Sequence, residues 1–129
     1  MKTMWAPWRI EYILKDKEGR CIFCAALADQ DDLTLYKGQK TMVTMNKFPY
    51  INGHLLVAPI SHIATLDQLN KSEMGDLLAT VEQSVGILKK IMQPDGFNVG
   101  LNLGKVAGAG VEEHLHFHIV PRWFGDTNA

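Results

Sequence analysis

This 129-residue sequence has only two cysteines, no long apolar run and almost no net charge. Each of these shortages argues against a class of protein. A formal net charge of −1 argues against a broad surface for nucleic acid or an anionic membrane. No apolar run approaches about 18 residues, so we expect no membrane span. The opening segment has Pro7, Arg9 and Glu11 where a secretory signal would be apolar. We therefore expect a cytoplasmic protein with no nucleic-acid or membrane partner.

Hydrophobic residues make up 47% of the sequence, the ordinary range for a globular chain, which argues against disorder. The length suits one domain with a sizeable core, and neither repeats nor linkers divide it. We predict a single domain over residues 1–129. Residues 1–20 are aromatic and broken by proline, and we expect them to form an N-terminal arm that packs on the body or on a partner.

The apolar pattern predicts strands and helices in a mixed order. Apolar positions at three- and four-residue spacing from Met74 to Met92 predict one long helix, and Asn70 with Glu73 is typical of a capping box. Shorter patterns predict short helices at residues 24–30 and 64–69 and strands at 33–38, 41–48, 53–60, 97–104 and 114–123. Strands that meander, then a long helix, then two more strands indicate an α+β fold with an antiparallel sheet.

The cysteines, Cys21 and Cys24, stand in the stretch "CIFC". In a reducing compartment this pattern indicates half of a metal site or a redox pair rather than a structural disulfide. A thioredoxin-like motif would begin a helix after a strand, whereas here a charged stretch comes first. All cysteines and histidines fall in three short segments, so two cysteines and two histidines can complete a tetrahedral zinc site, although the spacing is not that of a zinc finger.

The stretch "HLHFHIVP" at residues 114–121 holds three of the five histidines, two residues apart. On a strand they would share one face, and Leu115, Phe117 and Ile119 would share the other. They could decorate a solvent face, bind a metal, or do acid–base or nucleophilic chemistry. Neighbours on a strand face are about 6.6–7 Å apart, so two of these histidines could bind one metal only if their rings lean together. With two thiolates available elsewhere, only one histidine of the three need bind the metal. The glycine-rich stretch at residues 104–113 lacks the P-loop pattern but offers backbone N–H groups to an anion.

These residues resemble a known family. "HLHFHIV" is similar to the HIT (histidine triad) motif, in which three histidines alternate with apolar residues. The resemblance extends to "MWAPWRIEYI", "CIFC", "NKFPYINGHLLVAPISHI" and "HIVPRWFGDTN", and thus to nearly the whole chain. The bacterial branch that resembles it most includes diadenosine tetraphosphate (Ap4A) phosphorylases and hydrolases. The resemblance implies a HIT-like α+β fold and a homodimer whose helices pair across the two-fold axis and whose sheets join.

The resemblance also implies a role for particular residues. His116, the middle histidine, would be the nucleophile, and His118 would contact the transferred phosphate and the leaving oxygen. A structural zinc would be bound by Cys21, Cys24, His62 and His114. Substrate contacts would come from Asn46 in the nucleoside pocket, from His54 beside the triad, and from Asn102, Gly108 and Gly110 near the phosphates.

The leading hypothesis is an enzyme that cleaves dinucleoside polyphosphates through a nucleotidyl-histidine, with water or phosphate as the acceptor. A nucleoside phosphoramidase would use the same chemistry on a P–N bond. A nucleotide-binding regulatory module would bind AMP with little turnover. A metal hydrolase would instead use all three histidines of the triad as ligands.

Overall fold

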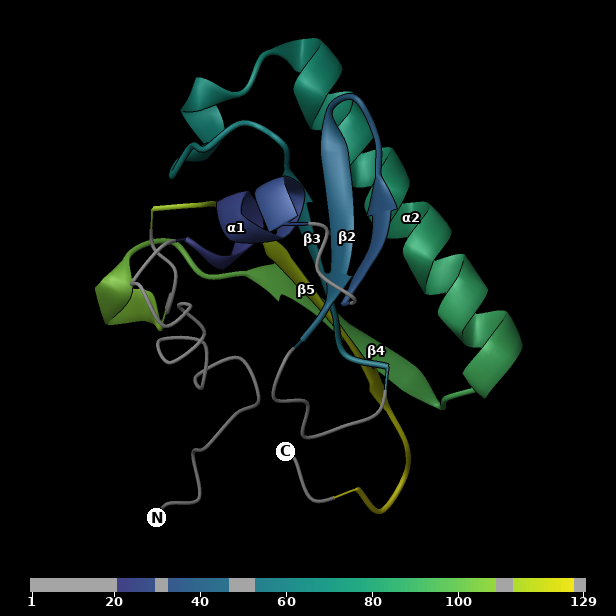
Figure 1. Cartoon of the computed structure of the whole chain (residues 1–129). Coiled ribbons are helices and arrows are strands. Elements are labelled where there is room, and N and C mark those ends of the chain that lie inside the picture. The colour runs from purple at the N-terminus through teal and green to yellow at the C-terminus, as the bar shows by residue number, and fades with distance from the viewer. Residues whose placement is uncertain (1–20, 30–32, 47–52, 109–112, 127–129) are drawn as a thin grey trace.

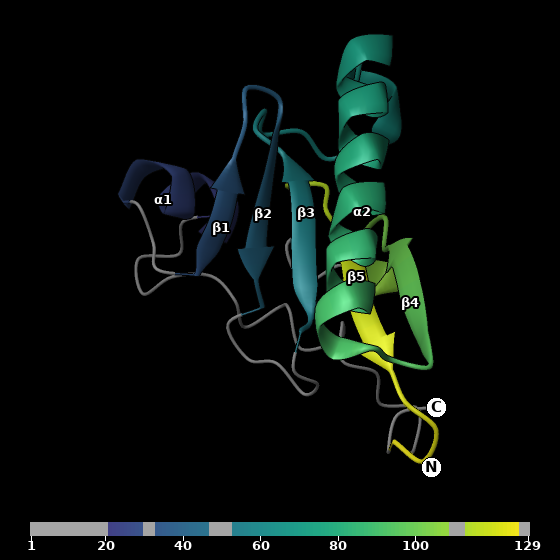
Figure 2. The same ribbon diagram turned by 90° about the vertical axis from the view of Figure 1, so that its right-hand side faces the viewer.

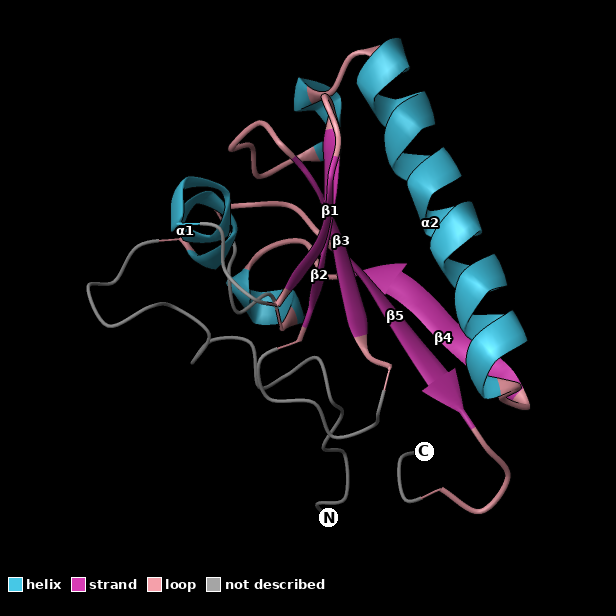
Figure 3. Ribbon diagram, turned by 45° about the vertical axis from the view of Figure 1, so that its right-hand side comes forward, coloured by secondary structure: helices cyan, strands magenta, loops and turns pink. Residues whose placement is uncertain are grey.

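A five-stranded antiparallel sheet separates two helices (Figures 1 and 3). The computed structural model describes residues 21–29, 33–46, 53–108 and 113–126. The sheet order is β1-β2-β3-β5-β4, which Figure 2 shows from the side of α2. The elements are α1 (Ile22–Asp29), β1 (Thr34–Lys37), β2 (Thr41–Met45), β3 (Leu55–Pro59), α2 (Lys71–Met92), β4 (Gly96–Leu101) and β5 (Phe117–Arg122), with 3-10 turns η3 (Leu66–Gln68) and η4 (Lys105–Ala107). The predicted α+β class with an antiparallel sheet, one long helix and short helices is confirmed.

Alternation along the central strands explains why helices cover both faces of the sheet. All five residues of β3 are buried. Because successive side chains point to opposite faces, β3 supplies two cores. Leu55 and Val57 pack toward α2, in a cluster with Val43, Leu77, Val81, Leu88, Leu115 and Ile119. Leu56 and Ala58 pack toward α1, in a cluster with Cys21, Phe23, Ala26 and Met42.

Helix α2 begins and ends at residues suited to those positions. Asn70 Oδ1 accepts from the Glu73 backbone N–H at 2.7 Å, and Glu73 Oε1 accepts from the Asn70 N–H at 2.9 Å. This is the predicted capping box, which satisfies two N–H groups that would otherwise lack partners within the helix. The helix ends at Gln93, whose φ of 50° is left-handed, just after two lysines that suit the negative end of the helix dipole. None of the described helices combines the length and apolarity of a membrane-spanning segment.

The predicted fifth strand, residues 114–123, was wrong at its start. The ladder with β4 ends at the pair Leu101↔Phe117, and the ladder with β3 ends at Val57↔Phe117. Before it, the Leu115 N–H donates to the Ile63 carbonyl at 2.7 Å, outside both ladders. His118 therefore lies on β5, whereas His114 and His116 precede it. The three histidines are thus not all on a strand, but the predicted alternation of faces is present. Leu115, Phe117 and Ile119 pack in the cluster on the α2 side. The rings of His114 and His116 contact Phe23, which belongs to the cluster on the α1 side.

The other predicted elements are present, with shifted bounds. The hairpin at residues 33–48 appears as β1 and β2, whose register runs from Thr34↔Thr44 to Lys37↔Met42. The predicted fourth strand ends at Leu101, and its last part leads into η4 because Gly104 and Gly108 adopt positive φ. The arm at 1–20, residues 47–48 of the predicted second strand and Gly110 lie outside the described residues.

Candidate active site and metal centre

Two cysteines and two histidines meet at the N-terminal end of α1. Cys21 precedes the helix and Cys24 lies in its first turn, while His62 follows β3 and His114 precedes β5. The Nδ1 atoms of His62 and His114 are 3.2 Å apart. Cys24 Sγ lies 3.2 Å from His62 Nδ1, and Cys21 Sγ lies 3.3 Å from His114 Nδ1. All four ligand atoms lie within 4.8 Å of one another.

These distances fit a tetrahedral zinc ion. Zn–S bonds of about 2.3 Å and Zn–N bonds of about 2.0–2.1 Å place tetrahedral ligand atoms about 3.3 Å apart for two nitrogens and about 3.6 Å for a sulfur and a nitrogen. His114 Nε2 donates to the Pro59 carbonyl at 2.8 Å, so its proton is on Nε2 and its Nδ1 lone pair faces the cluster. The donor set is thus the one expected of a structural zinc site.

Burial sets the protonation of the two enclosed ligands. It raises the pKa of the Cys21 thiol to about 11 and lowers the pKa of His114 to about 4. A neutral imidazole is already the form that binds a metal, whereas the thiol has to lose its proton. Metal binding would therefore release a proton from Cys21.

The backbone carbonyl of His114, two residues earlier, orients the side chain of His116. Its Nδ1–H donates to the carbonyl oxygen of His114 at 2.8 Å. The proton is then on Nδ1, and Nε2 carries the lone pair. The ring of Phe23 lies 4.9 Å from the ring of His114 and 4.9 Å from that of His116, measured between centroids. The side chain of His116 is 4% exposed, so this orientation is fixed by packing as well as by the hydrogen bond.

A second chain of contacts fixes His118. Asn46 Nδ2 lies 2.9 Å from His54 Nδ1, and an amide nitrogen can only donate, so His54 Nδ1 accepts. His54 then carries its proton on Nε2, which lies 3.3 Å from His118 Nδ1. We therefore assign the proton of His118 to Nε2. His116 and His118 therefore have opposite tautomers, with the proton on Nδ1 in His116 and on Nε2 in His118. Their ring centroids are 5.1 Å apart.

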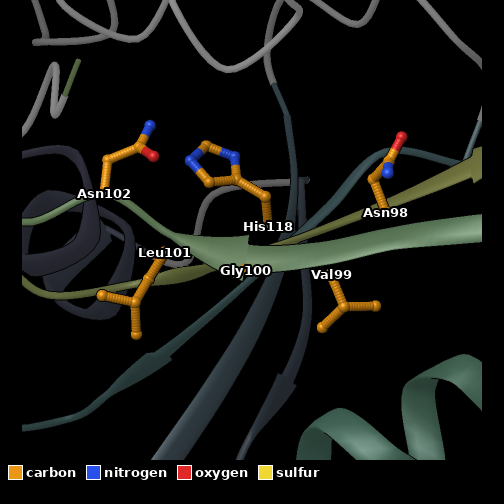
Figure 4. Close-up of a pocket in the computed structure, with 6 residues that line it drawn as sticks. All are labelled: Asn98, Val99, Gly100, Leu101, Asn102 and His118. Carbon is orange, nitrogen blue, oxygen red and sulfur yellow. The ribbon is translucent and has the colours of Figure 1, made fainter. Parts of the chain in front are cut away.

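A hollow of about 200 Å³ runs along β4 beside His118. Figure 4 shows Asn98, Asn102 and His118 rising from the same side of the β4 ribbon, while Val99 and Leu101 point to the other side. Asn102 Nδ2 lies 3.5 Å from the Gly108 carbonyl, a distance at which a hydrogen bond is weak. Its amide can therefore turn to a ligand at small cost.

Comparison with known proteins identifies the family to which this fold and site belong. Residues 28–125 match the HIT domain family. This chain belongs to the HIT family. The resemblance stated from the sequence is thereby confirmed, and the buried histidine cluster is the HIT motif seen in three dimensions.

Named relatives of this HIT protein include enzymes of two kinds. It is 34% identical over 139 residues to the AP-4-A phosphorylase of Mycobacterium tuberculosis, covering 99% of this chain and 71% of the relative. It is 31% identical over 103 residues to the adenosine 5'-monophosphoramidase of Schizosaccharomyces pombe, covering 79% of this chain and 74% of that protein. Its fold matches a crystal structure of a zinc-bound histidine triad family protein from Mycobacterium smegmatis with a TM-score of 0.74 and 26% identity, over 84% of this chain and 79% of the other.

The HIT fold brings most of the predicted site residues together in two groups. The metal cluster contains the four predicted ligands, Cys21, Cys24, His62 and His114. Around the hollow and the triad lie Asn46, His54, Asn102, His116 and His118, and Gly108 ends the turn after β4. Their roles in substrate binding and catalysis stay predictions.

Sequence reasoning missed three residues of the site. Phe23 packs on two histidine rings, and Pro59 supplies the carbonyl that orients His114. Neither carries a sequence signal for such a role, because an aromatic ring inside "CIFC" and a backbone carbonyl can serve many purposes. Asn98 had a signal: it stands four residues before Asn102 in an alternating strand and so shares its face.

Proposed function

We propose that this protein cleaves dinucleoside polyphosphates such as Ap4A at an α-phosphorus, through a nucleotide bound covalently to His116. The observation that carries the proposal is the 2.8 Å hydrogen bond from His116 Nδ1–H to the His114 carbonyl, because it makes Nε2 the nucleophilic atom of the ring. The 34% identity to an AP-4-A phosphorylase supports the choice of substrate.

In the first step, His116 Nε2 attacks the α-phosphorus. An Nε2–P bond forms while the bond from phosphorus to the bridging oxygen of the β-phosphate breaks. With Ap4A, the leaving group is ATP and the enzyme retains AMP on His116. The carbonyl of His114 stabilises the positive charge that develops on the ring, because it accepts from Nδ1–H.

His118 is the donor that this step needs at the leaving oxygen. The contact chain from Asn46 through His54 puts the His118 proton on Nε2. A hydrogen bond donated from Nε2–H stabilises the charge on the leaving oxygen as the P–O bond breaks, and the proton stays on the neutral imidazole. Asn102 would bind the non-bridging oxygens.

In the second step, the bond between His116 and phosphorus breaks when water or inorganic phosphate attacks from solution, and the proton of the attacking group passes to solvent. Water gives AMP, and phosphate gives ADP. Both acceptors regenerate the same neutral tautomer of His116, because the Nδ1–H donor to His114 is retained throughout.

A zinc ion bound by the four-residue cluster would tie together α1, the segment after β3 and the loop before β5. His114 turns its Nδ1 toward Cys21, whereas His116 uses its own Nδ1 on a carbonyl. Among the described residues, the metal-binding group contains one histidine of the triad, which argues against a hydrolase with three histidine ligands. We propose a structural role, supported by the zinc-bound family member from Mycobacterium smegmatis.

One assay tests the proposal. Purified protein is incubated with Ap4A, with and without inorganic phosphate, and the products are identified by chromatography. ATP is the leaving group for either acceptor. ADP plus ATP formed only with phosphate would identify a phosphorylase, and AMP plus ATP formed without phosphate would identify a hydrolase. Absence of ATP under both conditions would refute the proposal.

A second candidate is supported by the 31% identity to an adenosine 5'-monophosphoramidase. His116 would attack the phosphorus of a nucleoside phosphoramidate, and His118 Nε2–H would donate a hydrogen bond to the leaving nitrogen, which takes its proton from solvent. Faster release of AMP from the phosphoramidate than from Ap4A would favour it. Tight AMP binding with negligible turnover of either compound would instead favour a regulatory module.

A further inference from the structure

The hollow beside His118 extends beyond the residues that the proposed chemistry uses. Strand β4 pairs with β5 through Gly100↔His118 and Asn98↔Val120. Asn102 follows Leu101, the partner of Phe117, so it lies toward the end of the hollow nearer to His116. Asn98 lies at the other end, on the same side of the strand (Figure 4). Asn98 and Asn102 are four positions apart in the sequence, which corresponds to about 13 Å between their Cα atoms along an extended strand.

Gly100 leaves the floor of this hollow open. It stands midway between the two asparagines, and any side chain there would project onto the same face. Its φ is not in the left-handed region, and a Cβ placed on it would meet no atom within 4 Å. Neither backbone conformation nor packing within the described residues requires glycine here. A glycine inside a strand commonly marks a place where a ligand approaches the backbone.

Arg122 orients the amide of Asn98. A guanidinium group can only donate, so its Nη1 contact must be to Asn98 Oδ1, and the two N–H donors on Nδ2 are directed away from it. Arg122 is itself held by Asp126, through Nε at 2.8 Å and Nη2 at 2.6 Å. Its charge is thus matched by a carboxylate, and it acts as a positioning residue for the amide. Donation from a cation to the amide oxygen also strengthens the N–H donors on the same group.

We propose that Asn98, oriented by Arg122, binds the phosphates beyond the one attacked by His116. This inference rests on the proposed function and names the part of the substrate that lies along β4. The phosphorus to be attacked lies at the Asn102 end, the leaving oxygen meets His118 beside Gly100, and the remaining phosphates extend toward Asn98. A phosphoramidate is too short to reach Asn98, whereas a triphosphate leaving group crosses the open floor at Gly100.

The variant Asn98→Asp tests the subsite. It keeps the shape of the side chain and an oxygen for Arg122, but it replaces the N–H donors with an anionic oxygen that repels phosphate. We expect kcat/KM for Ap4A, relative to kcat/KM for adenosine phosphoramidate, to fall about tenfold or more, mainly through KM. Asn102→Ala serves as the matched control, because it lowers both values together. Equal losses on both substrates for Asn98→Asp, or no loss on either, would overturn the inference.

A binding measurement keeps the subsite separate from the proposed function. Calorimetry with ATP and with AMP gives an affinity ratio for the wild type and for Asn98→Asp, whether or not Ap4A is cleaved. A fall in the ATP-to-AMP ratio of about tenfold supports the subsite, and an unchanged ratio overturns it. If the wild type cleaves only the phosphoramidate, the proposed function fails while the ratio still decides the subsite.

The pair of Asn98 and Arg122 supplies a further check on positioning. Arg122→Gln should lower ATP affinity in part, because the amide is no longer held. The same change made together with Asn98→Asp should have little further effect, since the two residues act through one contact. Fully additive losses would mean that Arg122 acts on stability or on phosphate by itself, and would overturn its assigned role.

Discussion

His116 Nδ1 lies 2.8 Å from the carbonyl oxygen of His114, and the ring of His114 lies in the cysteine–histidine cluster. One residue therefore contributes its side chain to the proposed metal centre and its backbone to the proposed nucleophile. Loss of metal would loosen the loop that carries this carbonyl. The two sites are distinct in chemistry but share a mechanical support.

His116→Ala should lower kcat by several orders of magnitude while nucleotide affinity changes little, because the ring supplies an interaction made in the covalent step. His118→Ala should be milder, with a loss of about 10–100-fold, since it removes one hydrogen bond to a charged oxygen. Mass spectrometry of enzyme quenched during turnover should reveal a nucleotidyl adduct in the wild type. Near-normal rates for His116→Ala would contradict the assignment.

Asn46→Asp should reverse the tautomers of two histidines without changing the shape of the site. A carboxylate can only accept, so His54 would carry its proton on Nδ1, and His118 would lose the Nε2–H donor. We expect kcat to fall by about as much as in His118→Ala, roughly 10–100-fold, because the same hydrogen-bond donor is lost. Asn46→Ala is the control, because it leaves the tautomers of His54 unconstrained and should cost less. Nitrogen-15 NMR of the imidazoles would report the tautomers directly, and an unchanged His118 would disprove the reversal.

One zinc ion per chain should be found by elemental analysis of metal-replete protein. Cys21→Ser should remove it and lower the melting temperature by roughly 10 °C, because metal binding contributes to folding free energy. His54→Ala should retain the metal, since His54 lies outside the cluster. Loss of zinc in both variants would mean that the cluster is assigned wrongly.

The protein should be a homodimer, with about twice the chain mass of 14.4 kDa by light scattering. Leu78 on α2 is 50% exposed and Val99 on the edge strand β4 is 45% exposed, which suits helices that pair and sheets that join. Leu78→Glu combined with Val99→Lys should give monomers. Ile91→Glu is the control, because Ile91 is 73% exposed but lies on another side of the helix. A monomeric wild type at micromolar concentration would rule the dimer out.

The sequence predicted the parts of the fold that local pattern controls. Helix α2 appears with its capping box because apolar spacing and the Asn70–Glu73 pair act over a few residues. The start of β5 could not be predicted in the same way. It depends on where Leu101 and Val57 end the two ladders and on a hydrogen bond to Ile63, which lies 52 positions before Leu115.

The site shows the same contrast between features that the sequence predicts and features that depend on the assembled fold. Residue types and the family resemblance predicted which side chains gather around the triad and the metal cluster. The tautomers could not be predicted, because they follow from the Asn46 amide and from a backbone carbonyl, and their distances exist only once the sheet is assembled. Phe23 was missed for a related reason: ring packing on a histidine leaves no trace in a single sequence.

The place of β5 in the sheet has a consequence for the newly made chain. β5 follows every other described strand in the sequence, yet it lies between β3 and β4 and joins them. During synthesis, the ribosome releases β3 and then β4 before their common partner, so both have unpaired edges open to other chains until β5 emerges. The triad histidines lie on β5 or just before it, in the segment that fills the space between β3 and β4. A folded, active chain has therefore already paired these edges of β3 and β4. Protection of the nascent chain by chaperones matters most in the interval before residue 117 emerges.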